Sequence, residues 1–214
     1  MKPKSQSPSA PVIRKIPAQT LWYFYAVLVI EGASLMAVEL IGAKLIAPFY
    51  GNSLYVWAAV LATTLGGLAL GYFTGGWIST RFPSVKTLAL IIGISALIVI
   101  VMPHTSYFIM DATLGLELRL GILISCIFFL TPPLFCFGLV GPLVVRLSTT
   151  DVRSVGKVAG TTYFISTAGG VVATFLYGFY FIPFIGLRMS SYITGAALGI
   201  MALTYFIILQ RKSN

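Results

Sequence analysis

The sequence predicts an all-α integral membrane protein with six transmembrane helices, and three observations lead to this fold class. Of the 214 residues, 58% are hydrophobic and only 9% are charged, whereas a soluble domain carries about 25% charged residues. The apolar residues form repeated runs of about 20, the length that a helix needs to cross a bilayer. These runs lack the alternation of polar and apolar residues that is typical of a membrane β-barrel.

The first 20 residues predict a tail outside the membrane. They are rich in proline, serine and basic residues, show no periodicity and end near Arg14 and Lys15, so we expect a disordered, basic cytoplasmic tail. The apolar run that follows is too long for a signal peptide and has no small-residue cleavage site, which favours an uncleaved anchor. We therefore expect residues 21–210 to form the transmembrane domain and 211–214 a cytoplasmic C-terminus.

The distribution of basic residues predicts the orientation of the six spans, which we place at 21–47, 54–79, 86–102, 118–147, 159–182 and 188–209. With the N-terminus inside, only Arg119 and Arg188 lie outside, beside Asp111 and Glu117. The cytoplasmic side collects Lys2, Lys4, Arg14, Lys15, Arg81, Lys86, Arg146, Arg153, Lys157, Arg211 and Lys212. This bias obeys the positive-inside rule, and it predicts an inner-membrane protein with both termini in the cytoplasm. A net charge of +9 placed in this way does not indicate nucleic-acid binding.

The first span carries Glu31 and Glu39 well inside an apolar run, with Lys44 near its far end. A charge at the bilayer centre costs roughly 2.5–3.5 kcal/mol, so two carboxyls in one span need partners, protons or water. On a helix they lie about 80° apart around the axis and about 12 Å apart along it, and can face one cavity at two depths. Three arrangements follow: a proton relay, a cation site, or ion pairs with Lys44, Arg119 or Arg188.

Small residues recur every four positions in the second and fifth spans. The second has Thr63, Gly67, Gly71, Gly75 and Ser79; the fifth has Ser166, Gly170, Thr174 and Gly178. One offset of 103 residues maps the first series onto the second, and TLGG onto TAGG. This predicts a 3+3 inverted repeat, with Gly67, Gly71, Gly75, Gly170 and Gly178 as helix-packing positions. Small residues at this spacing are also common in unrelated helix bundles.

Prolines interrupt the fourth span at 131–133 and 138–142. They free carbonyls that either line a binding site or are satisfied by ordinary packing. We expect residues 103–117 to form the longest outer loop, with His104 in a surface or capping role. Cys126 and Cys136 have no metal-ligand spacing and are expected to be inert, buried thiols.

Aromatic residues stand at both ends of the first span and predict two interfacial belts. Tyr55 and Trp57, at the outer turn, fit a belt, and they could instead form a cage around an organic cation.

Two blocks, EGASLMAVELIGAKLIAPFYGNSLYVW (31–57) and GGLALGYFTGGWISTRFP (66–83), resemble the membrane half of fused major-facilitator/spermidine-synthase-like proteins. Three later blocks are similar to the same family: GLVGPLVVRLS (138–148), VGKVAGTTYFISTAGGVVAT (155–174) and FIPFIGLR (181–188). The resemblance implies half of a major-facilitator-like bundle. It places the family's signature positions on Glu31, Gly32, Glu39, Gly42, Lys44, Pro48, Gly51, Tyr55 and Trp57.

The chain also departs from that family. Lys44 stands where the pattern has arginine, which keeps the charge but loses the bidentate fork. Thr80 replaces the aspartate of the major-facilitator loop between the second and third spans. The soluble aminopropyltransferase domain and its glycine-rich cofactor loop have no counterpart here, so we expect no enzymatic activity and no cofactor. The chain also lacks the short motifs of proteases and hydrolases.

The leading functional hypothesis is a transporter-like protein that binds or moves a small cationic, polyamine-like solute or protons. Its candidate ligand- or proton-binding residues are Glu31, Glu39, Lys44, Tyr55 and Trp57, and no metal site is expected. Because six spans equal half of a major-facilitator transporter, this hypothesis implies a homodimer in the bilayer. The alternative is a non-transporting subunit or scaffold of a larger membrane complex, in which the glutamates are structural.

Overall fold

The computed structural model describes residues 17–209, so nearly all of the predicted N-terminal tail and residues 210–214 lie outside the described part. Six helices in this part are long and apolar enough to cross a membrane. They are α1 (Ala18–Tyr50), α2 (Leu54–Arg81), α3 (Val85–Thr113), α4 (Leu118–Ser148), α5 (Val155–Leu176) and α6 (Leu187–Thr204). A short helix, η1 (Val152–Ser154), precedes α5; wider, π-type turns continue α5 as η2 (Tyr177–Ile185) and α6 as η3 (Tyr205–Leu209). The predicted all-helical class with six long apolar helices is confirmed.

Short turns join the helices, and local sequence explains where several of them end. Gly51 and Gly186 have φ angles of 77° and 86°. Glycine adopts such angles without strain, so these positions end α1 and separate η2 from α6. Ser84 caps α3 by accepting a hydrogen bond from the Thr87 amide at 3.0 Å, and Glu117 caps α4 by accepting one from the Leu120 amide at 3.3 Å. The Glu117 carboxylate is therefore engaged in capping the first turn of α4.

The prediction of a long outer loop at 103–117 is wrong, because α3 continues as a helix to Thr113. Pro103 lies inside this helix and lacks the amide hydrogen that would bond the carbonyl of Val99. The Ser191 hydroxyl of α6 donates a hydrogen bond to that carbonyl at 2.6 Å. A neighbouring helix thus satisfies the backbone group that the proline frees, which lets α3 run on.

The expected interruption of the fourth span is also wrong. Although it contains Pro132, Pro133 and Pro142, α4 is one continuous helix from Leu118 to Ser148. Packing on both sides supports it, since α4 lies against α1, α2 and α3.

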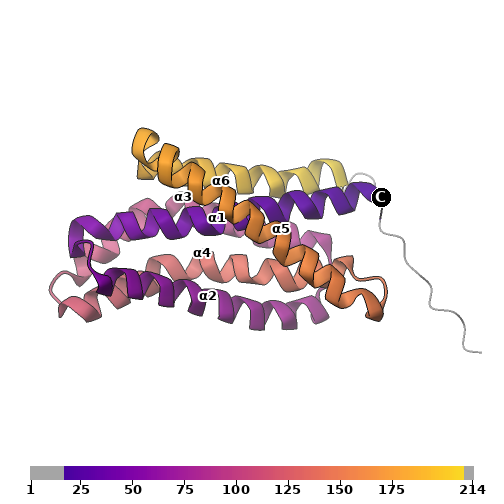
Figure 1. Cartoon of the computed structure of the whole chain (residues 1–214), viewed down its shortest axis with the longest axis horizontal. Helices are drawn as coiled ribbons and strands as arrows, with labels where there is room; N and C mark the ends of the chain where they lie inside the picture. The colour runs from indigo at the N-terminus through magenta and orange to yellow at the C-terminus, as the bar shows by residue number, and fades with distance from the viewer. Residues whose placement is uncertain (1–16, 210–214) are drawn as a thin grey trace, which may run out of the picture.

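Close packing joins the helices in three principal pairs: α2 with α4, α5 with α1, and α3 with α6. Figure 1 shows α2 running beside α4, and α5 slanting across α1. A Cβ atom placed on Gly71 would lie 2.7 Å from the Gly138 Cα atom, and one on Gly75 would lie 2.9 Å from the Leu139 Cα atom. The small-residue face of α2 therefore lets the backbone of α4 approach closely.

A buried polar chain ties α1, α3 and α4 together near their α1–α2 end. The Tyr50 hydroxyl donates to the Thr113 hydroxyl at 2.7 Å, and the Thr113 and Ser125 hydroxyls lie 2.8 Å apart. Buried hydroxyls without such partners would each carry a desolvation cost. These three hydroxyls therefore connect the ends of α1, α3 and α4 by hydrogen bonds.

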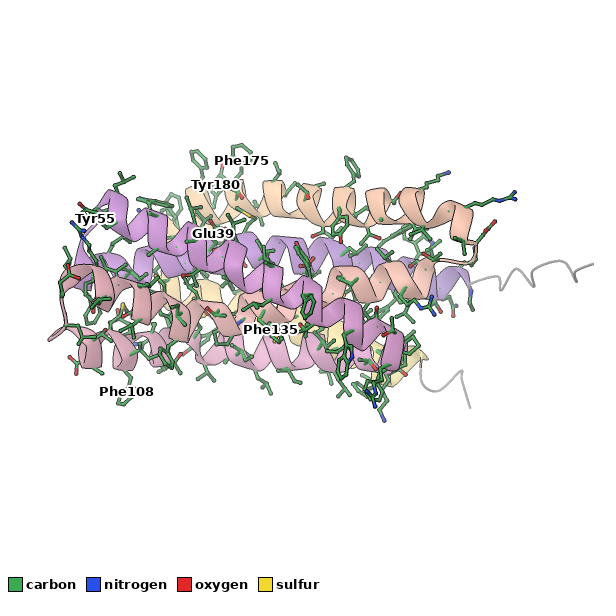
Figure 2. All side chains as sticks on the ribbon, turned by 90° about the horizontal axis from the view of Figure 1, so that it is seen from below. Glu39, Tyr55, Phe108, Phe135, Phe175 and Tyr180 are labelled. Atoms are coloured by element: carbon green, nitrogen blue, oxygen red, sulfur yellow. The ribbon has the colours of Figure 1, made fainter. Side chains whose placement is uncertain are left out.

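We expect Tyr50→Phe to lower stability by about 1 kcal/mol, because it removes one buried hydrogen bond and leaves the Thr113 hydroxyl short of a donor. Thermal unfolding in detergent measures the change. Tyr180→Phe is the matched control, since Tyr180 is 61% exposed and points away from the bundle (Figure 2). Equal melting of the Tyr50→Phe variant and the wild type would contradict a stabilising role for this chain of hydroxyls.

Candidate functional site

The crossing of α1 and α5 brings two backbones into direct contact. A Cβ atom on Gly32 would collide with the Ser166 carbonyl, and one on Gly169 would lie 3.0 Å from the Val29 Cα atom. A Cβ atom on Gly170 would lie 3.1 Å from the Gly32 carbonyl oxygen. Only hydrogen atoms fit between the helices here, so glycine at these positions decides how close α5 comes to Glu31.

Glu31 lies beside this crossing and is 5% exposed. The Ser166 hydroxyl donates a hydrogen bond to its Oε2 atom at 2.8 Å. Within residues 17–209, no lysine or arginine forms an ion pair with Glu31. Burying an isolated charge is costly. Among the described residues, its one hydrogen-bond partner is a neutral hydroxyl, which leaves the carboxyl with capacity for a proton or a cation.

A hollow of about 170 Å³ lies between α1, α4 and α5, toward the end of the bundle where α1 begins. Tyr25, Ser148, Thr161 and Thr162 contribute hydroxyl groups to its wall, and Lys157 contributes an ammonium group. Leu28 and Thr162 in the wall stand three and four residues before Glu31 and Ser166, respectively. A hollow with both polar and apolar groups in its wall therefore reaches to within one helical turn of the Glu31–Ser166 pair.

Glu39 has a different environment. It is half-buried, and within the described part of the chain its carboxylate has no hydrogen-bond or ion-pair partner. Figure 2 shows it in the half of the bundle nearer the α1–α2 turn. Met36, between the two glutamates in sequence, would meet a Cβ atom on Gly170 at 2.9 Å. An apolar side chain thus packs on α5 between Glu31 and Glu39, and Glu39 does not line the hollow below Glu31.

The remaining candidate ligand residues lie apart from the glutamates. Lys44 is exposed, and within the described residues it forms no ion pair with Glu39, in keeping with their five-residue spacing. Tyr55 is 50% exposed, and the Arg119 guanidinium lies over its ring, 5.0 Å from the centroid. This cation–π contact means that a cation of the chain itself already covers Tyr55. Trp57 is 36% exposed on the same helix.

Four of the five predicted packing glycines face another helix, and one does not. Gly67, Gly71 and Gly75 face α4, and Gly170 faces α1. Gly178 is different, because a Cβ atom there would meet nothing within 4 Å in the described part of the chain.

Sequence reasoning missed three features around the α1–α5 crossing: one hydrogen bond, one contact between aromatic rings and one residue of the hollow. Ser166 appears in the small-residue series, but its role as a donor to Glu31 is not readable because 135 residues separate the two. The Tyr72 and Tyr163 rings meet nearly at right angles with centroids 6.3 Å apart, and they link α2 to α5. Thr162 lines the hollow below Glu31. The four-residue spacing between Thr162 and Ser166 is the only local signal that they share a face.

The six apolar helices define the chain as a multi-pass helical membrane protein. Comparison of the chain with family models, with curated proteins and with solved structures finds no match in any of the three. The resemblance of residues 31–57 and 66–83 to fused major-facilitator/spermidine-synthase-like proteins therefore stays a prediction. Within residues 17–209, no group of three or more histidine, cysteine, aspartate or glutamate residues is arranged to hold a metal ion.

Proposed function

We propose that the chain is a transporter-like membrane protein that binds a small cation at Glu31 and Glu39. The observation that carries the proposal is the state of Glu31, which is buried in a span, bonded by one neutral hydroxyl and paired with no basic residue in the described part. A carboxyl that only packed against its neighbours would carry the same desolvation cost, and no bound cation would offset it. A glutamine would accept the same hydrogen bond, so the carboxyl itself points to cation chemistry.

The proton is the cation that best fits Glu31. Hydroxyl groups stand among apolar residues in the wall of the hollow that approaches it, and a proton, unlike a larger cation, can pass along hydroxyls and water. Glu39, which is less buried and has no partner, is the better position for an organic cation such as a polyamine.

The predicted inverted repeat draws support from the packing pairs. An operation that exchanges the first three helices with the last three turns the α2–α4 pair into the α5–α1 pair, and it leaves α3 paired with α6. We propose that the two halves are such a repeat, with the Glu31 site at the crossing of α1 and α5. Arg81, Lys86, Arg146, Arg153 and Lys157 all stand at the end where α1 begins. This supports placing that end in the cytoplasm of an inner-membrane protein.

A homodimer would cover the exposed side of Glu39. An ionisable group facing acyl chains is costly, yet Glu39 is only half-buried. On α2, Gly66 and Gly76 face no other residue of the described chain, and Gly160 on α5 and Gly178 on η2 are similarly open. Such bare positions allow close helix contact across an interface. We propose that a second copy packs on α2 and α5.

Cross-linking tests this arrangement. With Cys126 and Cys136 replaced by alanine, we expect Gly66→Cys to give a disulfide-linked dimer in membranes under mild oxidation. Leu97→Cys is the control, because Leu97 is 66% exposed on α3, at the opposite side of the bundle from α2. Cross-linking at Leu97 alone would contradict the α2–α5 interface. A stoichiometric partner of different sequence, found after gentle extraction, would instead favour the alternative of a non-transporting subunit.

Proteoliposomes test the function. We expect the purified chain to dissipate an imposed pH gradient, followed with an internal pH dye, and to take up labelled spermidine. Glu39→Gln should reduce spermidine uptake by at least about tenfold, equivalent to about 1.4 kcal/mol, because a neutral amide does not attract the cation. Asp111→Asn is the matched control at an exposed acid. Wild-type liposomes that move neither cation would reject transport.

A further inference from the structure

Two further hollows lie away from the glutamates, along the seam where α3 packs on α6. The first, of about 470 Å³, opens near the start of α6. Its wall combines apolar groups with Tyr107, Arg188 and Tyr192. Arg188 is exposed and forms no ion pair with any carboxylate in residues 17–209. The wall of this hollow therefore holds a guanidinium without a carboxylate partner in the described residues, together with two tyrosine side chains.

The second hollow is an apolar groove of about 560 Å³ on the same pair of helices. Small residues leave it open, because Gly93 on α3 and Gly199 on α6 have no side chains to fill it, whereas Gly195 on α6 lets α3 approach closely at Ile100 and Ala96. Leu97 and Leu203 stand in its walls, 66% and 58% exposed. The groove runs on α3 from Ala89 to Ile100, about 16.5 Å at 1.5 Å per residue. That length is close to half of a hydrocarbon core about 30 Å thick, the depth of one leaflet.

The two hollows follow one another along the seam. On α3 the groove ends at Ile100 and the first hollow begins at Pro103; on α6 the corresponding residues are Gly195 and Tyr192. Both steps are three residues, or about 4.5 Å. His104 and Tyr192 stack across the seam at this boundary, with ring centroids 6.3 Å apart and planes 18° apart. The hollow that contains Arg188 and the apolar groove therefore follow one another along the α3–α6 seam.

We propose that this seam binds one phospholipid with an anionic headgroup, the phosphate at Arg188 and one acyl chain in the α3–α6 groove. A guanidinium donates two parallel hydrogen bonds to a phosphate, and tyrosines are suited to the headgroup level. At this end of the bundle, Asp111 and Glu117 form no ion pair with Arg188, and Glu117 caps α4. The positive charge therefore takes its counter-ion from the membrane.

The shape and the chemistry of the groove together favour a lipid as its occupant. Its lining is almost wholly apolar, which suits an acyl chain, and the single charged residue of the adjoining hollow is a cation. A second copy of the chain would also cover an apolar groove, but it would bring no anion to Arg188 unless Asp111 or Glu117 of that copy reached it.

Native mass spectrometry of the full chain, reconstituted with equal amounts of phosphatidylglycerol and phosphatidylcholine, tests the proposal. We expect phosphatidylglycerol to be retained over phosphatidylcholine by at least about tenfold, a difference of about 1.4 kcal/mol in binding. In Arg188→Gln this ratio should fall to within about twofold of one. Arg119→Gln is the matched control, because Arg119 is the other outer arginine and lies over Tyr55, away from the seam.

A second variant tests the groove. A Cβ atom on Gly199 would meet only the Ala96 Cβ atom, at 4.0 Å, so Gly199→Leu fills the groove without disturbing the helix contact. We expect this variant to lose both lipids while its melting temperature stays near that of the wild type. A wild type without preference, an equal loss of preference in Arg119→Gln, or unchanged retention in Gly199→Leu would each overturn the proposal. Dimers held through α3 and α6 would do the same.

Discussion

Glu31→Gln is expected to abolish proton movement in proteoliposomes, with a loss of at least about 100-fold, or about 2.7 kcal/mol at 1.36 kcal/mol per decade. The amide accepts the Ser166 hydrogen bond as the carboxylate does, so the α1–α5 contact stays intact. It cannot take up or release a proton at the site. The measurement is the initial rate at which an internal pH dye reports collapse of an imposed gradient.

Two controls separate chemistry from folding. The melting temperature of Glu31→Gln should equal or exceed that of the wild type, because the change removes a buried ionisable group. Ser166→Ala should lower the rate less than Glu31→Gln does, since it deletes one hydrogen bond and keeps the carboxyl that takes up the proton. If Glu31→Gln moves protons at the wild-type rate, Glu31 is not the site, and its burial has another cause.

Gly32→Ala is expected to destabilise the bundle more than any single change to alanine at an open glycine. Its Cβ atom would occupy the position of the Ser166 carbonyl, a backbone atom that cannot move without shifting α5. Overpacking of this kind costs about 1–3 kcal/mol or more. At roughly 2–4 °C per kcal/mol for a chain of this size, melting should fall by several degrees.

The same change should also slow proton movement, because pushing α5 away lengthens the bond between Ser166 and Glu31. Gly156→Ala is the matched control: Gly156 belongs to α5, and a Cβ atom there meets nothing within 4 Å. The alanine at Gly156 should leave both melting and rate unchanged. Normal melting of Gly32→Ala would show that α1 and α5 do not approach as closely as described.

Local chemistry explains why most of the fold was predictable. Apolar runs separated by short polar or glycine-containing turns specify helices, because a backbone in lipid must satisfy its own hydrogen bonds. The end of α3 could not be predicted from local sequence, because a contact with another helix decides it. Pro103 suggests a break, and only Ser191, which comes from α6, satisfies the Val99 carbonyl and keeps the helix intact.

The candidate site shows the same division. The two carboxyls were conspicuous because charge is rare in such runs, and their order of depth followed from helix geometry. Their different surroundings were not visible. Glu31 is covered by Ser166 and α5, whereas Glu39, eight residues further along α1, is half-open.

By itself the sequence determined that this chain is a six-helix membrane bundle with two acids in its first span, because hydrophobicity and helical period are properties of short segments. The tertiary structure alone decided which glycines touch which backbones, which acid finds a hydroxyl partner, and where Arg188 meets an apolar groove. Those outcomes depend on contacts between distant residues, such as Gly75 with Leu139, 64 positions apart, and Val29 with Gly169, 140 positions apart, and no local pattern encodes how two distant helices cross.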